Sequence, residues 1–258
     1  MERRQNNMNL AIIQARMGSS RLPNKVMMDL CGKPALWHVI DRVKKAKRID
    51  EIVVATTIEK QDLQLVKFCA DNGVRVYVGS ESDVLDRYYQ AAKLFKPDNV
   101  IRITSDCPLI DHELIDEIIN IHTEQKNDYT SNTLVDSFPD GLDCEVMKYE
   151  VLEKAWKKAE LLSEREHVTP YIKKGNFKKF NVICEPDKRN FRWTLDTEKD
   201  YEFIKAVYGH LYALNPDFLS KDIYDLLNKI PEINDINSGI IRNEGYLKSI
   251  ANDKIINQ

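Results

Sequence analysis

The chain has 258 residues, with 38 lysines and arginines against 41 aspartates and glutamates and a formal net charge of -3. This near-balance excludes the broadly basic surface that nucleic-acid binding requires, so we expect no nucleic-acid partner, and any anionic ligand must meet a local group of cations. The apolar share of 43% is ordinary for a globular protein with its own core.

Cysteines and apolar runs restrict the class of protein further. The five cysteines include no CxxC pair, so neither a disulfide framework nor a zinc site is indicated. No apolar run approaches the roughly 18 residues of a membrane span, and the polar start lacks the apolar stretch of a signal peptide. We therefore expect a cytoplasmic protein with no membrane partner, whose residues 1–8 form a flexible N-terminal tail.

Short apolar runs alternate with amphipathic segments along the first half of the chain. The runs at 10–13, 52–55, 74–78 and 100–103 are typical of buried strands. Helical spacing of apolar residues marks the segments at 35–43, 63–70, 83–95 and 114–119. This order predicts an α/β fold: a Rossmann-like, mostly parallel sheet with helices on both faces, which binds ligands beyond the carboxyl ends of its strands.

From residue 129 the pattern loosens. An alternating segment at 142–147 and a run at 192–195 predict further strands, and helices are predicted near 150–160, 164–173 and 198–211. No Gly/Ser-rich linker separates these parts, and the sequence contains no internal repeat. We expect one domain over residues 9–258, with a small inserted lobe at about 129–190.

Cations gather in the loop that follows the first predicted strand. Arg16, Arg21 and Lys25 lie there among small hydrogen-bond donors, namely Gly18, Ser19 and Ser20. Planar guanidinium forks, an ammonium group and backbone donors together suit a polyphosphate. The loop is neither a GxxxxGK[ST] nor a GxGxxG motif. A solvated basic loop is the alternative that composition leaves open.

Two aspartates follow predicted strands in the same manner. Asp106 comes after the run at 100–103, and Asp196 comes after the run at 192–195. Mg²⁺ is commonly held by one or two carboxylates together with substrate phosphates, so such a pair would suit a nucleoside triphosphate. Aspartate after a strand is also a common helix cap or turn residue, which is the alternative interpretation.

The first loop carries a family resemblance. Its sequence A-R-M-G-S-S-R-L-P-N-K at residues 15–25 resembles the A-R-x-x-S-x-R-L-P-x-K signature of the cytidylyltransferases, in particular the spore coat polysaccharide biosynthesis protein F group, which is related to the acylneuraminate and Kdo enzymes. The resemblance extends to about residue 211. One departure is Asn24, where glycine is usual; asparagine tolerates positive φ, so the loop can keep its shape.

The resemblance implies a nucleotide-diphospho-sugar transferase-like fold and a Mg²⁺-dependent reaction. CMP would pass from CTP to a small anionic acceptor, a sugar acid or related phosphorylated compound, with release of pyrophosphate, to make a precursor of a surface polysaccharide or glycoconjugate. The matching catalytic residues are Arg16, Arg21, Lys25 and Asp106, and the matching metal ligands are Asp106 and Asp196. A nucleotide-sugar glycosyltransferase on the same fold, a transferase using another nucleoside triphosphate on a sugar phosphate, and a non-catalytic binding protein are the alternatives.

The binding residues are predicted from the same strand ends and from the inserted lobe. For the nucleotide we expect Ala15, Gly18, Ser19, Ser20, Thr56, Ser80 and Arg87. For the acceptor we expect Asp143, Arg165 and His167. A helix cap at residue 83 and a solvated helical turn at 164–167 are the structural alternatives for these segments. Relatives commonly form homodimers through this lobe, so a homodimer is expected.

Overall fold

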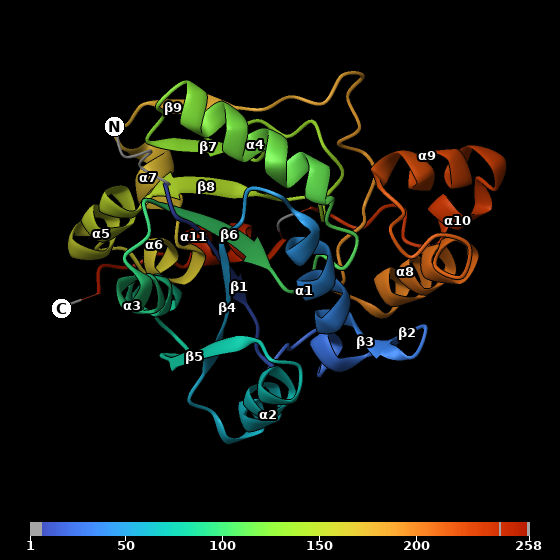
Figure 1. Cartoon of the computed structure of the whole chain (residues 1–258), viewed down its shortest axis with the longest axis horizontal. Helices are drawn as coiled ribbons and strands as arrows, with labels where there is room; N and C mark the ends of the chain where they lie inside the picture. The colour runs from blue at the N-terminus through green and yellow to red at the C-terminus, as the bar shows by residue number, and fades with distance from the viewer. Residues whose placement is uncertain (1–6, 243, 257–258) are drawn as a thin grey trace, which may run out of the picture.

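The computed structural model describes residues 7–242 and 244–256, built around one seven-stranded sheet of order β5-β4-β1-β6-β8-β7-β9 (Figure 1). Four neighbouring strands are parallel: β5 (Arg75–Gly79), β4 (Glu51–Thr57), β1 (Asn9–Gln14) and β6 (Asn99–Thr104). Next, β8 (Glu145–Lys148) is antiparallel to β6 and to β7 (Tyr129–Ser131), while β9 (Lys179–Asn181) is parallel to β7. The predicted mostly parallel sheet is confirmed.

Successive apolar residues of the central strand β1 contribute alternately to two hydrophobic cores, one on each face of the sheet. Ala11 and Ile13 belong to one core, and Leu10 and Ile12 belong to the other, because successive strand residues point to opposite faces. The first core is covered by α1 (Ala35–Lys45), α2 (Leu63–Asp71), α4 (His112–Glu124) and α8 (Glu198–Leu211). The second is covered by α3 (Val84–Phe95), α5 (Tyr149–Lys158) and α7 (Pro170–Lys174) (Figure 1).

Three predicted elements of the later lobe need correction. The helix predicted at 164–173 is two helices, α6 (Leu162–His167) and α7, because Val168 has a φ of 69° and Pro170 begins a new helix. The strand predicted at 142–147 begins only at Glu145. The run at 192–195 forms no strand; its one ladder contact is an isolated bridge from Arg192 to Asp140.

Several short elements are not predicted by the sequence pattern. Near the first loop are η1 (Lys25–Met27), the small hairpin of β2 (Asp29–Leu30) and β3 (Lys33–Pro34), and η2 (Lys60–Asp62). The chain ends in α9 (Ser220–Lys229), α10 (Glu232–Asp235) and α11 (Glu244–Ala251). In Figure 1 α8, α9 and α10 lie together at one side of the molecule, whereas α11 lies behind the sheet close to α6.

The flexible tail predicted over residues 1–8 does not extend to residue 8. Residues 1–6 lie outside the described residues. The carbonyl of Met8 accepts hydrogen bonds from the backbone of Asp98 and Asn99, and its N–H donates to the Asp98 carboxylate at 2.7 Å. Met8 therefore belongs to the folded domain.

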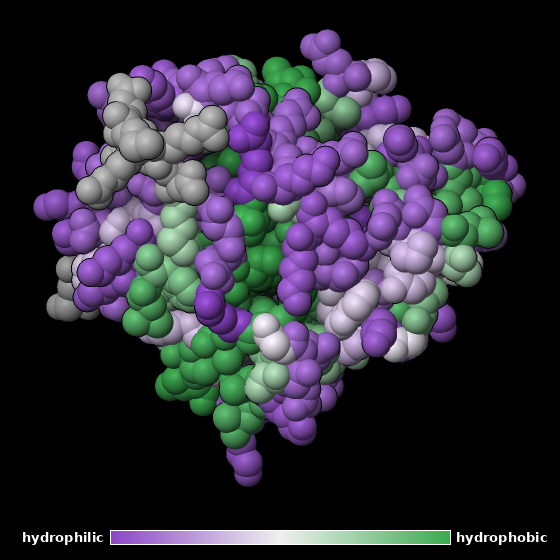
Figure 2. Space-filling model, in the orientation of Figure 1, coloured by the Kyte–Doolittle hydropathy of each residue, from purple (hydrophilic) through white to green (hydrophobic). Residues whose placement is uncertain are grey.

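The surface on the face seen in Figure 2 is mostly hydrophilic, with apolar side chains gathered at its lower edge near β5. Exposed apolar residues of that part of the chain include Ile58, Leu63 and Val78. None of the helices in the described part of the chain has the length and apolar character needed to span a bilayer.

Candidate active site

The loop after β1 is held in shape by backbone geometry and by one buried carboxylate. Asn24 adopts a φ of 60°, the left-handed conformation that glycine provides at this position in the family signature. Its N–H donates to the carbonyl of Met17. The N–H of Met17 donates to Asp62 at 2.7 Å, and Asp62 is itself bonded by the Thr57 hydroxyl. Asp62 is therefore a supporting residue that the sequence motif does not reveal.

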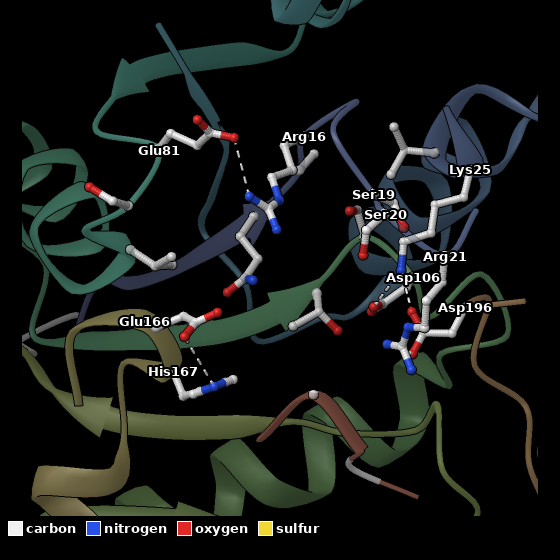
Figure 3. Close-up of a pocket in the computed structure, with 18 of the residues that line it drawn as sticks. Arg16, Ser19, Ser20, Arg21, Lys25, Glu81, Asp106, Glu166, His167 and Asp196 are labelled. Atoms are coloured by element: carbon white, nitrogen blue, oxygen red, sulfur yellow. Dashed lines mark hydrogen bonds and ion pairs between the residues drawn. The ribbon is translucent and has the colours of Figure 1, made fainter. Parts of the chain in front are cut away.

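Lys25 joins the two predicted metal carboxylates. Its Nζ lies 3.0 Å from Asp106 Oδ2 and 2.6 Å from Asp196 Oδ1, and only 12% of its side chain is exposed. Arg21 contacts the other oxygen of Asp196 at 2.9 Å. Figure 3 shows these four side chains converging from the first loop and from the ends of two later segments. Asp106 and Asp196, which follow Lys25 by 81 and 171 positions in the sequence, thus meet at its ammonium group.

Backbone contacts, not a strand, bring Asp196 to Asp106. The N–H of Leu195 donates to the carbonyl of Asp106 at 2.8 Å. Gly141 packs against the same segment with a φ of 109°, and a Cβ there would lie 2.5 Å from the backbone nitrogen of Thr194. The N–H of Asp196 is fixed by Asp200 at the start of α8. This close packing explains how Asp196 reaches the site without the predicted strand.

The charges of this cluster stabilise each other. Burial by itself would raise the pKa of Asp106, but the charge of Lys25 and hydrogen bonds from Thr104 and Lys25 lower it to about 2. Burial opposes the charge of Lys25, yet attraction to Asp106 and Asp196 outweighs that effect and raises its pKa. Asp106 and Lys25 are therefore both ionised at neutral pH, and the Lys25 ammonium also contacts Asp196.

Two pockets meet at this cluster. The first, of about 650 Å³, contains ten of the predicted site residues: Ala15, Arg16, Ser19, Ser20, Arg21, Lys25, Arg87, Asp106, His167 and Asp196. The second, of about 480 Å³, contains Asp143 together with Arg21, Asp106, His167 and Asp196. The shared residues stand at the junction, so a ligand group in one pocket would lie next to a ligand group in the other.

Arg87 and Arg16 lie at the far end of the first pocket. Arg87 is 2% exposed, donates from Nη1 to the carbonyl of Ser80 at 2.6 Å and leaves Nε without a partner, and burial lowers its pKa. Arg16 is half-exposed and pairs with Glu81 at 3.3 Å (Figure 3). Both residues line the first pocket, and their role in binding a nucleotide stays a prediction.

Four predicted binding residues lie outside both pockets. Thr56 is fully buried inside β4. Ser80 accepts from Asp83 and Arg87, and the pocket wall is made by Glu81 and Ser82 instead. Gly18 is not among the lining residues of either pocket, although a Cβ there would lie 3.8 Å from Glu81, which lines the first.

Arg165 is the fourth, and its contacts are structural. It bonds Asp83, the N-cap of α3, through Nε at 2.9 Å and the carbonyl of Trp156 at 2.6 Å. For Ser80 and Arg165 the physical cause is the same: their hydrogen-bonding groups are used within the fold.

The second pocket is rich in ion pairs that sequence reasoning missed. Glu145, almost fully buried, pairs with Lys173 at 2.9 Å and with Arg102. Arg192 pairs with Asp140 at 2.7 Å and with Asp200 at 2.9 Å. These partners come from different elements, so no local spacing signals them.

Two carboxylates of this pocket are crowded. Although Arg192 pairs with Asp140, burial and the neighbouring charge of Asp143 raise the pKa of Asp140 to about 7. Burial also raises the pKa of Asp143, against the charge of Arg242. Burial in this pocket thus favours the protonated form of both carboxyl groups more than the neighbouring arginines alone would allow.

His167 lies where the two pockets join, on the opposite side from Lys25 (Figure 3). Its Nε2 lies 3.8 Å from Glu166, and its ring meets the Tyr246 ring edge-on with centroids 5.0 Å apart. Burial lowers its pKa. The predicted acceptor-side position of His167 therefore agrees with its place in the second pocket.

Comparison with known proteins gives the family. The cytidylyltransferase family model matches residues 10–236, which include the first loop, both aspartates and the whole sheet. The chain belongs to the cytidylyltransferase family. This assignment makes it a nucleotidyltransferase and disfavours the glycosyltransferase and non-catalytic alternatives.

Relatives of this cytidylyltransferase cover nearly its whole length. An uncharacterized protein of Methanocaldococcus jannaschii is 41% identical over 92% of the chain and 97% of its own length. The spore coat polysaccharide biosynthesis protein SpsF of Bacillus subtilis is 36% identical over 86% of the chain and 95% of its own length. The structure of a cytidylyltransferase from Leptospira borgpetersenii superposes with a TM-score of 0.84, at 33% identity, over 91% of the chain and all of that protein.

Proposed function

We propose that this cytidylyltransferase transfers CMP from CTP to a sugar acid or a related phosphorylated acceptor and releases pyrophosphate. The observation that carries the proposal is the meeting of Lys25 with Asp106 and Asp196 at the junction of two pockets. The first pocket would hold the nucleotide, and the second would hold the acceptor. The relative named for spore coat polysaccharide biosynthesis supports a product that feeds polysaccharide synthesis.

The residues present fit a Mg²⁺ ion shared with the nucleotide. Asp106 and Asp196 are both bonded to one nitrogen, at 3.0 Å and 2.6 Å, so their carboxylates lie close enough together to share one ion. Among the described residues no group of three acidic, histidine or cysteine side chains could hold a metal. Two carboxylates completed by phosphate oxygens are a usual ligand set for Mg²⁺. When bound, Mg²⁺ would supply charge neutralisation at the α-phosphate.

The protein's own residues then account for binding and orientation. Arg16, Arg21 and Lys25 would neutralise the triphosphate, with Ser19 and Ser20 as hydroxyl donors from the same wall. An acceptor oxygen held in the second pocket would form a bond to the α-phosphorus. The bond from that phosphorus to the bridging oxygen would break, and pyrophosphate would leave with this oxygen. Positioning and charge neutralisation are the main contributions in such transfers.

Pyrophosphate release tests the proposal. Wild-type protein is assayed with CTP, ATP, GTP and UTP, each with Mg²⁺, against a panel of sugar acids and sugar phosphates, beside Asp106→Ala. We expect release with CTP and at least one acceptor, and a loss of about 10²-fold or more in Asp106→Ala. Absence of release with every combination, or full activity of Asp106→Ala, would contradict the proposal.

A further inference from the structure

The C-terminal segment of the chain returns to the site after leaving the region matched by the family model, which ends at residue 236. Near its end it is tied to the start of α6: the N–H of Leu162 donates to the carbonyl of Lys254 at 2.9 Å, and the N–H of Ile256 donates to the carbonyl of Glu160 at 2.8 Å. Asp253 also accepts from the hydroxyl of Ser163 at 2.7 Å. At the other end of the segment Asn237 donates to the carbonyl of Arg192 and to the Asp200 carboxylate, each at 2.9 Å, so both ends are anchored.

Between these anchors the segment forms part of the pocket walls. Glu244 and Gly245 line both pockets, and Ile241, Arg242 and Tyr246 line the second. Glu244 contacts Arg21 of the phosphate-side loop at 3.5 Å, and Tyr246 packs its ring against His167. The segment thus connects the triphosphate side of the site with the acceptor side.

Arg242 is the basic side chain of this segment that lines the second pocket. It is 16% exposed, and its guanidinium lies 3.1 Å from Asp143 and 3.4 Å from Asp136. It also donates to the carbonyl of Phe138 at 3.0 Å. Arg242 therefore ties both ends of the 136–143 loop together, while Arg192 pairs with Asp140 in its middle, and these two cations offset the repulsion among the loop's carboxylates.

The charges of this pocket indicate what part of the acceptor it takes. Each of the four arginines that line it is paired with a carboxylate: Arg21 with Asp196, Arg102 with Glu145, Arg192 with Asp140, and Arg242 with Asp143. What the wall offers a ligand is mainly carboxylate oxygen, which when ionised accepts hydrogen bonds and cannot donate them. Hydroxyl groups of a sugar are the matching donors.

We propose that Arg242 is a positioning residue, which holds the carboxylates of the 136–143 loop as hydrogen-bond acceptors for the hydroxyl-rich end of the acceptor. This inference rests on the proposed function, since it needs the second pocket to bind the acceptor. It places the specificity for a polyhydroxylated substrate on a segment outside the region that the family model matches.

The test separates acceptor binding from nucleotide binding. Arg242→Gln, Arg242→Lys and Asp143→Asn are compared with wild type in Mg²⁺-dependent pyrophosphate release from CTP, using N-acetylneuraminate and 3-deoxy-manno-octulosonate as acceptors. CTP affinity is measured separately by calorimetry without acceptor, and thermal melting verifies folding. The matched control is Arg189→Gln, which removes an exposed arginine that pairs with Asp187 and lines neither pocket.

We expect Arg242→Gln and Asp143→Asn to raise the KM for the sugar acid by about tenfold or more, with CTP affinity within about twofold of wild type. Arg242→Lys should recover part of the loss, and Arg189→Gln should behave as wild type. An unchanged acceptor KM in folded Arg242→Gln, or an equal loss of CTP affinity, would overturn this inference alone. No release by wild type with either sugar acid would overturn the proposed function for sugar acids and this inference with it.

Discussion

The ammonium group of Lys25 lies 2.6 Å from a carboxylate oxygen of Asp196, although the two residues are 171 positions apart in sequence. The same nitrogen lies 3.0 Å from Asp106. A metal ion that binds between these carboxylates must either displace the Lys25 ammonium group or bind the carboxylates alongside it. The lysine is thus placed to hold the two acidic groups together before the nucleotide arrives and to contact its phosphates afterwards.

Replacement of Lys25 should affect the chemical step strongly. We expect Lys25→Met to lower kcat by about 10²-fold or more, because a fixed positive charge at the triphosphate is lost. Lys25→Arg should retain more activity, since the charge remains. Steady-state kinetics with CTP measures both. A kcat of Lys25→Met within about threefold of wild type would show that this charge does not act in the transition state.

Replacement of the two carboxylates should weaken the response to Mg²⁺. Asp106→Asn and Asp196→Asn are each expected to raise the Mg²⁺ concentration needed for half-maximal activity by about tenfold or more, because one charged oxygen ligand is lost. Activity is measured across a Mg²⁺ titration. Asp187→Asn, at an exposed aspartate outside both pockets, is the control. If both site variants titrate as the control does, the metal is not held by these residues.

Removal of the Glu145 charge should cost stability. Glu145 is 2% exposed and pairs with Arg102 and Lys173, so Glu145→Gln leaves two cations without their partner and should lower the free energy of unfolding by about 3–5 kcal/mol. Urea unfolding monitored by circular dichroism measures it. Glu202→Gln, on the exposed face of α8, should change it little. A loss below about 1 kcal/mol would contradict this role.

Glu145 should also make the free energy of unfolding depend on pH. Burial by itself would raise the pKa of Glu145, but the charges of Lys173 and Arg102 outweigh that effect and hold it far below its usual range. Because the folded pKa is depressed, the stabilisation is present above the unfolded value of about 4.3 and is lost as the pH falls below it. Wild-type stability should therefore fall more steeply below this pH than that of Glu145→Gln. Parallel curves for the two proteins would refute the assignment.

Arg165 should prove structural. Arg165→Gln breaks the contact with the N-cap Asp83 and with the Trp156 carbonyl, so we expect a loss of about 1–3 kcal/mol in the free energy of unfolding. The KM values for CTP and for the acceptor should stay within about twofold of wild type at a temperature where the variant is folded. A tenfold rise of the acceptor KM without loss of stability would instead support the acceptor-binding role predicted from the sequence.

The fold and the phosphate side of the site were predictable because their signals are local. Buried strands such as β1 and β6 have apolar runs, and the helices between them have helical spacing. Arg16, Arg21 and Lys25 lie in one short loop after β1, so placing the strand end also places the cations. Other strand ends gave no such signal: Thr56 is fully buried within β4, and the Ser80 hydroxyl accepts from the N–H of Asp83, contacts that the sequence pattern does not reveal.

The sequence by itself determined the order of strands and helices, the basic loop and the family to which the chain belongs. Only the tertiary structure decided that Asp196 reaches Lys25 without a strand, that Arg165 bonds within the fold, and that Arg242 meets Asp143 in the wall of the second pocket. These three outcomes depend on contacts between residues far apart in the chain. Periodicity and motif spacing describe only neighbours along the chain, whereas such contacts form when packing of the whole core brings distant segments together.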